Sequence, residues 1–324
     1  MHASQPVLTQ RGGNTSHAAV IGRGIGLPCV VGASNLKFNT RKEQLVAQNG
    51  RVFSAGETIT IDGSSGQVLA GAPKMREAVL DESFQALMDW ADEERDIAIR
   101  ANADTPADAQ TARNFNAEGI GLCRTEHMFF EPGRLTVMRE MIFAETSQDR
   151  RAVLERLLPM QRADFTQLFR IMEGKPVCIR LFDPPLHEFL PTDRTGQREL
   201  AEALDLPLSN VTRRIDAMME YNPMLGLRGV RLGVTVPEIY EMQARAIFEA
   251  TLDASVEGAP VVPEIMIPLV SAMREVELVK SSIDGVASAV RLERGKDFDY
   301  CLGVMVETPR AAIRAGDIAP HCAF

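Results

Sequence analysis

Apolar strands alternate with amphipathic helical stretches along most of this chain after residue 95. Six segments have the length and composition of strands, and in order they read DIAIRANAD, EGIGLCRTE, KPVCIRLFD, LRGVRLGV, APVVPEIMIPL and YCLGVMVETP. Strands joined through helices run parallel, because the helix carries the chain back to the edge where it started. The alternation therefore predicts an α/β fold over residues 96–324, namely a (β/α)8 barrel of the TIM type truncated after about six strands.

The chain before residue 96 has two other patterns. Residues 1–72 hold short apolar runs separated by glycine-containing turns, which predicts a small β-rich domain. Residues 73–95 carry apolar side chains every three or four positions among dense charge, which predicts a helical linker. A similar helical pattern near 191–222 interrupts the strand rhythm, so we expect a helical insertion on the rim of the barrel.

Composition argues against several classes of function. The 324 residues carry a formal net charge of −9 and no basic cluster interleaved with aromatics, so a nucleic-acid partner is not expected. The five cysteines stand singly, without the CxxC pairs of zinc sites, and this usage fits the reducing cytoplasm. No apolar run approaches the roughly 20 residues that span a bilayer, so we expect no membrane segment.

Charged residues follow the predicted strands. The carboxyl ends of barrel strands meet at one mouth, which is where the active sites of such barrels lie. Three guanidiniums there would bind a substrate that carries both a carboxylate and a phosphate. Carboxylates there would coordinate Mg²⁺ through their oxygen atoms. A charge at one strand end is usually a solvated loop residue, but here five ends carry one: Arg124 with Glu126, Arg180 with Asp183, Arg228, Glu264 and Glu307.

A lone histidine marks the N-terminal region. In RGGNTSHAAVIGRG, residues 11–24, two glycines and a capping hydroxyl at Thr15 or Ser16 predict a helix start with His17 in its first turn. A histidine in such a place can simply pack locally. The unpaired N–H groups and the dipole of the helix start nevertheless favour an attached phosphoryl group, and neutral imidazole is a nucleophile near pH 7. His17 is therefore a candidate phosphohistidine.

These segments resemble a known family. RGGNTSHAAVIGRGIGLPCVVG is similar to the phosphohistidine signature of the PEP-utilising enzymes, where PEP is phosphoenolpyruvate. GIGLCRTEHMFFE, IRLFDPPLHEFLP, NPMLGLRGVRL, PEIMIPL and GVMVETPRAA are similar to successive barrel segments of the same family. DPPLHEFLP and CRTEHMFFE are typical of its branch of pyruvate, phosphate dikinases. The resemblance runs through nearly all of the chain.

The resemblance implies a carrier and a reaction. Residues 1–72 would be a swivelling phosphohistidine domain, and His17 would exchange its phosphoryl group reversibly with pyruvate and PEP on the barrel. In the family, a separate N-terminal ATP-grasp domain passes the phosphoryl group from ATP to the histidine, and inorganic phosphate accepts another. These 324 residues do not include that domain, so we expect this chain not to use ATP by itself. The full-length enzyme is expected to be a homodimer.

The resemblance also implies roles for particular residues. Three arginines would bind the phosphoryl and carboxylate oxygens of the substrate, one carboxylate would be a Mg²⁺ ligand, and a second metal ligand is expected beyond Phe324. Neighbouring groups would support them, although the aspartate can instead close the DPPLHE turn. The residues are His17 as the nucleophile, Arg124, Arg180 and Arg228 for the substrate, Glu307 for the metal, and Asp183, Thr15 and Ser16 as supporting groups.

Two other functions stay open from the sequence. A PEP synthase, which passes the phosphoryl group from ATP with water as the acceptor, shares the histidine motif. A non-catalytic phosphocarrier would have His17 phosphorylated by a partner while the barrel turns over nothing. Both alternatives keep the phosphohistidine and differ in what the rest of the chain does.

Overall fold

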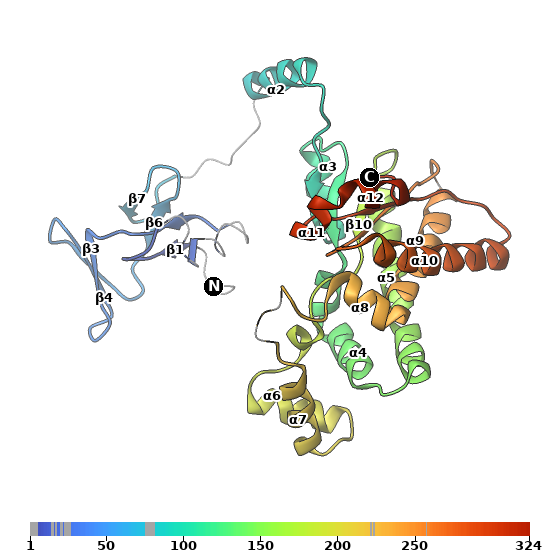
Figure 1. The fold of residues 1–324 in the computed structure, drawn as a ribbon. Helices are drawn as coiled ribbons and strands as arrows, with labels where there is room; N and C mark the ends of the chain where they lie inside the picture. The colour runs from blue at the N-terminus through green and yellow to red at the C-terminus, as the bar shows by residue number, and fades with distance from the viewer. Residues whose placement is uncertain are drawn as a thin grey trace. The chain divides into compact units, whose positions relative to one another are not determined.

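The computed structural model describes residues 6–13, 16, 18–19, 22, 27–74, 82–220, 222, 224–256 and 258–324 of the chain. The chain divides into two compact units, Met1–Glu94 and Arg95–Phe324 (Figure 1). The β-rich character predicted for the first region and the parallel α/β character predicted for the second are both confirmed.

The first unit is built from short strands in three small sheets. One pair is parallel, and the other two sheets are an antiparallel meander and a hairpin. The hairpin turn is held by Asp62, whose carboxylate accepts hydrogen bonds from the backbone N–H groups of Ser64 and Ser65. The strands are β1 (Val7–Leu8), β2 (Cys29–Val30), β3 (Leu36–Asn39), β4 (Gln44–Ala47), β5 (Val52–Ser54), β6 (Ile59–Asp62) and β7 (Gln67–Ala70), and the unit also includes the helix α2 (Glu82–Glu94).

The second unit is centred on a five-stranded parallel sheet. Its order is β12-β11-β10-β9-β8, so every strand lies beside its neighbour in the sequence. All four pairings are parallel, because each connection crosses over through helical segments. The strands are β8 (Ala101–Asn102), β9 (Ile120–Arg124), β10 (Val177–Arg180), β11 (Glu264–Ile267) and β12 (Cys301–Val304).

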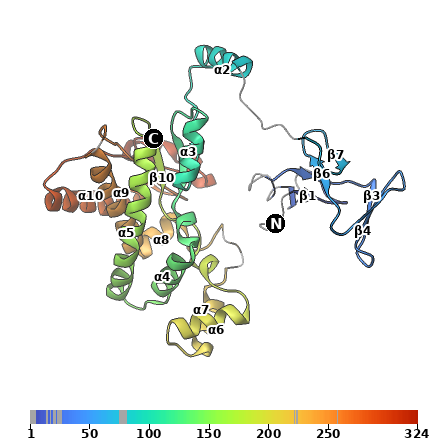
Figure 2. The ribbon, with the colours of Figure 1, turned by 180° about the vertical axis from the view of Figure 1, so that it is seen from behind.

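Helices cover one face of this sheet. α5 and α9 run side by side, and α10 packs against α9 (Figures 1 and 2). Two helices, α6 and α7, lie between the third and fourth strands of the sheet. The helices are α3 (Pro106–Asn114), α4 (Pro132–Phe143), α5 (Ser147–Ile171), α6 (Arg194–Ala203), α7 (Leu208–Met218), α8 (Gly229–Thr235), α9 (Pro237–Ser255), α10 (Met273–Arg294), α11 (Pro309–Ile313) and α12 (Ala315–Ile318), with single 3₁₀ turns η1 (Thr125–Phe130), η2 (Leu186–Phe189) and η3 (Ala319–His321).

One predicted strand is wrong. The segment LRGVRLGV, residues 227–234, forms α8 instead of a strand. The backbone N–H of Gly229 donates to the Asp183 carbonyl and that of Val230 donates to the Pro268 carbonyl, so both bonds go to loops that follow other strands. A short apolar run fits a strand or a buried helix equally well, and here the neighbouring loops decided between them. The sheet therefore has five strands within the described residues.

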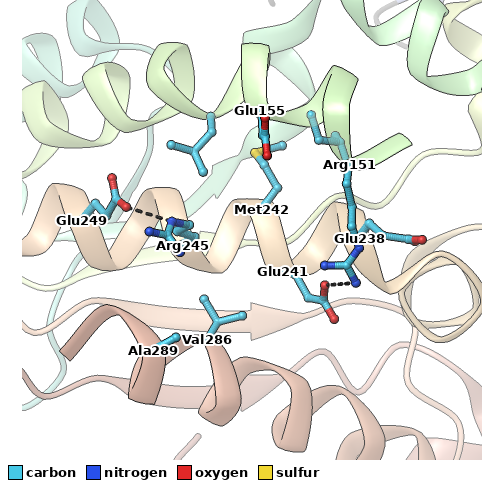
Figure 3. Close-up of a pocket in the computed structure, with 11 residues that line it drawn as sticks. Arg151, Glu155, Glu238, Glu241, Met242, Arg245, Glu249, Val286 and Ala289 are labelled. Carbon is cyan, nitrogen blue, oxygen red and sulfur yellow. Dashed lines mark hydrogen bonds and ion pairs between the residues drawn. The ribbon is translucent and has the colours of Figure 1, made fainter. Parts of the chain in front are cut away.

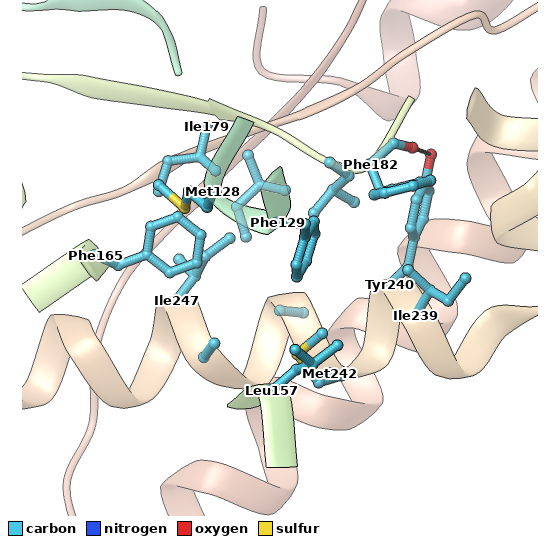
Figure 4. Packing of buried hydrophobic residues seen from close by; sticks show 14 of the residues in the cluster. Met128, Phe129, Leu157, Phe165, Ile179, Phe182, Ile239, Tyr240, Met242 and Ile247 are labelled. Carbon is cyan, nitrogen blue, oxygen red and sulfur yellow. Dashed lines mark hydrogen bonds between the residues drawn. The ribbon is translucent and has the colours of Figure 1, made fainter. Parts of the chain in front are cut away.

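The core anchors the loop that follows β10. Phe182 is fully buried, its N–H donates to the Gln243 side chain at 2.8 Å, and its carbonyl accepts from the Tyr240 hydroxyl at 2.9 Å (Figure 4). Its ring also packs against Phe129 and Phe189. A fully buried aromatic side chain stabilises a fold by about 1.5–3 kcal/mol. The backbone on either side of Phe182 is thus fixed in place by α9.

Within the described residues, every helix is too short or too polar to cross a lipid bilayer. All five cysteines are free thiols. Cys123 and Cys178 are buried, and burial raises the pKa of the Cys178 thiol to about 12. The buried cysteines therefore act as small apolar side chains of the core.

Candidate functional site

Two of the predicted arginines end neighbouring strands. Arg124 is the last residue of β9 and Arg180 is the last residue of β10, and their Cα atoms are partners in the parallel register. Residues paired in this way point to the same face of a sheet. The two arginine side chains therefore lie on the same side of the sheet at its carboxyl edge. The pattern of charged strand ends in the sequence predicts this arrangement.

Asp183 joins Arg180 to Arg228. Its carboxylate is 3% exposed, and Oδ2 lies 3.2 Å from Nη1 of Arg180 and 2.5 Å from Nη2 of Arg228. The Nε of Arg228 also donates to Oδ1 at 3.3 Å, so this guanidinium forms a two-pronged contact with the carboxylate. Asp183 fixes two arginines from different elements at one point, which is more than closing a turn.

Arg180 lies between two carboxylates. On the side away from Asp183, its Nη2 donates to the Glu126 carboxylate, which is also buried. The Thr125 hydroxyl donates to the Arg180 carbonyl at 3.0 Å. Within the described residues, the Nε of Arg180 and one oxygen of Glu126 are buried without a hydrogen-bond partner. Arg180 is therefore held between two carboxylates.

Arg228 reaches the site from a helix start. It is the extended N-cap residue of α8, with a φ of −148°, and the next residue, Gly229, has a φ of +55°. The prediction that Arg228 ends a strand is thus corrected, although the residue still joins the cluster. Burial lowers the pKa of Arg228, but its hydrogen bond to Asp183 and the charges of Asp183, Glu188 and Glu307 raise it overall. The guanidinium stays charged at any physiological pH.

Glu307 faces the same edge from the far end of the sheet. It lies three residues after β12 and is exposed. One carboxylate oxygen accepts the backbone N–H of Leu269 at 2.7 Å. Leu269 follows β11 and has a φ of +60°, which is strained for a residue with a branched side chain. The contact ties Glu307 to a loop that the packing holds in an unfavourable conformation.

We expect Gly229→Ala to disturb this corner. An added Cβ would lie 2.7 Å from the Leu269 Cβ and 3.1 Å from the nearer Asp183 oxygen, in a backbone conformation that favours glycine. The substitution should lower the free energy of unfolding by about 1–3 kcal/mol, measured by urea titration. Gly285→Ala is the matched control, because its added Cβ meets nothing within 4 Å in a helix. Equal effects of the two substitutions would contradict the crowding at Gly229.

Two further residues at this edge are missing from the sequence-based set. Asp104 follows β8 and accepts the backbone N–H of Arg124 at 2.6 Å through Oδ1. Its other oxygen lies 2.7 Å from Nδ1 of His127 and 3.6 Å from Nη1 of Arg124. The rule that charged residues follow strands points to Asp104 when it is applied to the segment DIAIRANAD, which ends there. His127 carries no comparable signal in the sequence.

Glu264 is placed at the opposite edge, which corrects the expectation for this residue. It is the first residue of β11, because Pro260 and Pro263 before it cannot donate ladder hydrogen bonds. Its carboxylate accepts from Nη1 of Arg100 at 2.5 Å and from Nη2 at 3.1 Å. Glu264 is therefore part of an ion pair at the amino ends of the strands and does not join the arginine cluster.

The histidine motif is only partly within the described residues. His17 and Thr15 lie outside them. Ser16 is described: its N–H donates to the Gly13 carbonyl at 2.9 Å, and its hydroxyl oxygen is buried without a hydrogen-bond partner among the described residues. Gly32 packs against this loop so closely that an added Cβ would lie 2.7 Å from the Gly12 carbonyl oxygen.

The helix-covered face holds a separate groove of about 590 Å³ between α5, α9 and α10 (Figure 3). Two pairs of its charged side chains contact each other: Arg151 lies 2.9 Å from Glu241, and Arg245 lies 2.9 Å from Glu249. None of the predicted site residues lines it. Self-paired charges of this kind fit a structural network better than a binding site.

Metal-ligating side chains do not cluster in the part of the chain that the structure describes: no three of the His, Cys, Asp and Glu residues there are grouped as a metal site would need. Glu307 has one carboxylate oxygen engaged by the backbone, and carboxylate oxygen is the donor type that Mg²⁺ prefers. Glu307 therefore has the donor type of a Mg²⁺ ligand.

Comparison with known proteins shows the family to which this chain belongs. The family model of the PEP-utilising enzyme PEP-binding domain matches residues 79–324, and that of the PEP-utilising enzyme mobile domain matches residues 1–66. The chain therefore belongs to the PEP-utilising enzymes, and it carries a mobile domain followed by a PEP-binding domain.

Several curated relatives bear the name pyruvate, phosphate dikinase. The chain is 54% identical to the Rhizobium meliloti (strain 1021) protein over 325 aligned positions, which cover 100% of this chain and 36% of the relative. It is 45% identical to that of Clostridium symbiosum, covering 100% and 37%, and 49% identical to that of Giardia intestinalis, covering 97% and 35%. The chain spans little more than a third of the length of these relatives.

Proposed function

We propose that this chain transfers a phosphoryl group reversibly between His17 and pyruvate, as part of a pyruvate, phosphate dikinase. One observation carries the proposal: Arg124, Arg180 and Arg228, from three elements far apart in the sequence, lie at one edge of the sheet, where Asp183 links the last two. Guanidiniums grouped in this way suit a small ligand that carries both a carboxylate and a phosphate.

Each group has a role in the proposal. The neutral imidazole of His17 accepts the phosphoryl group, and Thr15 and Ser16 donate hydrogen bonds to it. The arginines bind the phosphoryl and carboxylate oxygens and neutralise the charge that develops on the enolate oxygen of pyruvate. Asp183 orients Arg180 and Arg228. Because phosphoryl transfer needs mainly alignment and charge neutralisation, rigidly held arginines are the expected machinery.

Glu307 would hold Mg²⁺ through its carboxylate, with at least one more ligand supplied from outside the described residues. The bound ion would supply positive charge next to the enolate and phosphoryl oxygens. The chain itself contributes the carboxylate and the Leu269 N–H that fixes its direction.

The proposed domain plan is a swivelling domain at residues 1–72, a helical linker at 73–95 and a PEP/pyruvate domain at 96–324. We further propose that the sheet is part of a (β/α)8 barrel. The strand order supports this, because parallel strands follow one another in sequence order around a barrel, whereas an open doubly wound sheet reverses its order at a switch point. An ATP-grasp domain and a second protomer are partners proposed for the whole enzyme.

The test is phosphoryl transfer from PEP. The chain is incubated with PEP labelled in its phosphoryl group and with Mg²⁺, and protein-bound label is measured after acid and after alkali. We expect alkali-stable, acid-labile label on the wild type and on His321→Ala, and none on His17→Ala. Label that persists on His17→Ala contradicts the proposal. A folded wild-type chain that takes up no label would favour a phosphocarrier that a partner phosphorylates.

A further inference from the structure

Arg124 differs from the other two arginines in how it is held. Arg180 and Arg228 have side chains that are 10% and 16% exposed, and both contact a buried carboxylate directly. The Arg124 side chain is 32% exposed, and its only ion pair within the described residues is the 3.6 Å contact to Asp104. Arg124 is therefore the guanidinium most open to a ligand, and its direction depends on Asp104.

Asp104 is itself fixed on both sides. The preceding residue, Ala103, is buried, and its N–H donates to the Leu122 carbonyl at 3.2 Å. The following residue, Thr105, caps α3 through a reciprocal pair of hydrogen bonds with Asp108. The Asp104 side chain is 15% exposed. A strand end and a helix start thus hold this carboxylate in one position.

His127 completes the arrangement from the other side of the carboxylate. Its Nδ1 lies 2.7 Å from Oδ2 of Asp104, the same oxygen that faces the Arg124 guanidinium. An ionised carboxylate only accepts hydrogen bonds, so the proton of the imidazole lies on Nδ1. With Oδ1 accepting the Arg124 backbone N–H, both oxygens of Asp104 are engaged at the end of β9.

We propose that Asp104 and His127 are a positioning pair for Arg124. Asp104 sets the direction of the guanidinium, and His127 keeps the carboxylate from rotating away from it. The inference rests on the proposed function, since it concerns how Arg124 binds the phosphoryl or carboxylate oxygens of PEP. In this arrangement His127 acts by donating a hydrogen bond from Nδ1 to the Asp104 carboxylate, and its Nε2 has no role.

Two substitutions of His127 separate these roles. Asparagine places an amide donor close to the position of Nδ1, and glutamine places one close to that of Nε2. We expect His127→Asn to bind PEP like the wild type and His127→Gln to bind it more weakly. The reverse order would mean that His127 acts on the ligand through Nε2, and it would overturn the proposal.

Asp104→Asn tests the carboxylate. The amide oxygen still accepts the Arg124 backbone N–H, while the charge that orients the guanidinium is lost. We expect the PEP concentration for half-maximal labelling to rise about tenfold, and the rate at saturating PEP to stay within about twofold of wild type. Asp253→Asn is the matched control, because it also removes a carboxylate partner of an arginine, Arg162, on the helix-covered face. Equal effects of the two substitutions would overturn the proposal.

A second measurement does not need PEP. In ¹⁵N-histidine spectra, the His127 signal, assigned by its loss in His127→Gln, should show the proton on Nδ1 in the wild type and on Nε2 in Asp104→Asn. A wild-type ring with the proton on Nε2 would overturn the positioning pair by itself. A wild type that neither binds PEP nor takes up label from it would instead overturn the proposed function, and the pairing of Asp104 with His127 would still be read from the spectra.

Discussion

Asp183→Ala is expected to lower the free energy of unfolding of the second unit by about 3–5 kcal/mol, because it leaves the Arg228 guanidinium, which is 16% exposed, without a carboxylate partner among the described residues. The Asp183 carboxylate is 3% exposed and neutralises both Arg180 and Arg228. The side chains of Arg180 and Arg228 are only 10% and 16% exposed. Urea unfolding followed by far-ultraviolet circular dichroism measures the loss.

The control for Asp183 is a surface aspartate of the same unit. Asp317 is 46% exposed and pairs with Arg314 three residues before it in the sequence. Exposed pairs of this kind contribute about 0–1 kcal/mol, so Asp317→Ala should change stability little. Asp183→Asn should fall between the two alanine variants, because it keeps the shape and one acceptor. If Asp183→Ala is as mild as Asp317→Ala, the carboxylate does not hold the cluster together.

Arg124→Ala is expected to slow transfer from PEP at least about a hundredfold, which is the usual loss when a charge-stabilising donor is removed from an active site. The fold should be unaffected, because the side chain is a third exposed and its ion pair with Asp104 is long. The measurements are the initial rate of labelling from PEP and the urea midpoint. Arg156→Ala, which removes an arginine that is 54% exposed on α5, should change neither.

An unchanged labelling rate in Arg124→Ala would exclude this arginine from substrate binding.

Arg180→Ala separates substrate binding from stability less clearly. Its side chain is 10% exposed between two buried carboxylates, so alanine there would destabilise the protein and reduce activity for either reason. We therefore expect alanine to leave stability unchanged at Arg124 and to reduce it at Arg180.

Much of the second unit could be predicted, because its strands end at clear signals. The apolar run around Arg180 stops at Asp183, before two prolines, and the run before Arg124 stops at a polar turn, so both arginines are expected near strand ends, where the structure has them. Once the strands are known to be parallel, their carboxyl ends must share an edge. That reasoning brings Arg124 and Arg180 together without any coordinates.

The errors have physical causes. The segment at 227–234 has a strand-like alternation of apolar residues, but the carbonyls of Asp183 and Pro268 bind its first N–H groups and start a helix. Glu264 was expected at the carboxyl end because its apolar run was counted from residue 259, whereas the prolines delay the strand until Glu264 itself. In both places the hydrogen-bond partners of the backbone decided the outcome.

The sequence by itself determined the parallel α/β character of the second unit, the β-rich character of the first and the arginines that end β9 and β10, because these follow from local periodicity and turn residues. Only the tertiary structure decided that Asp183 bridges two arginines and that Asp104 and His127 lie against Arg124. Contacts of this kind depend on how separate loops pack over one sheet edge, and spacing along the chain does not encode the distance between side chains of different loops.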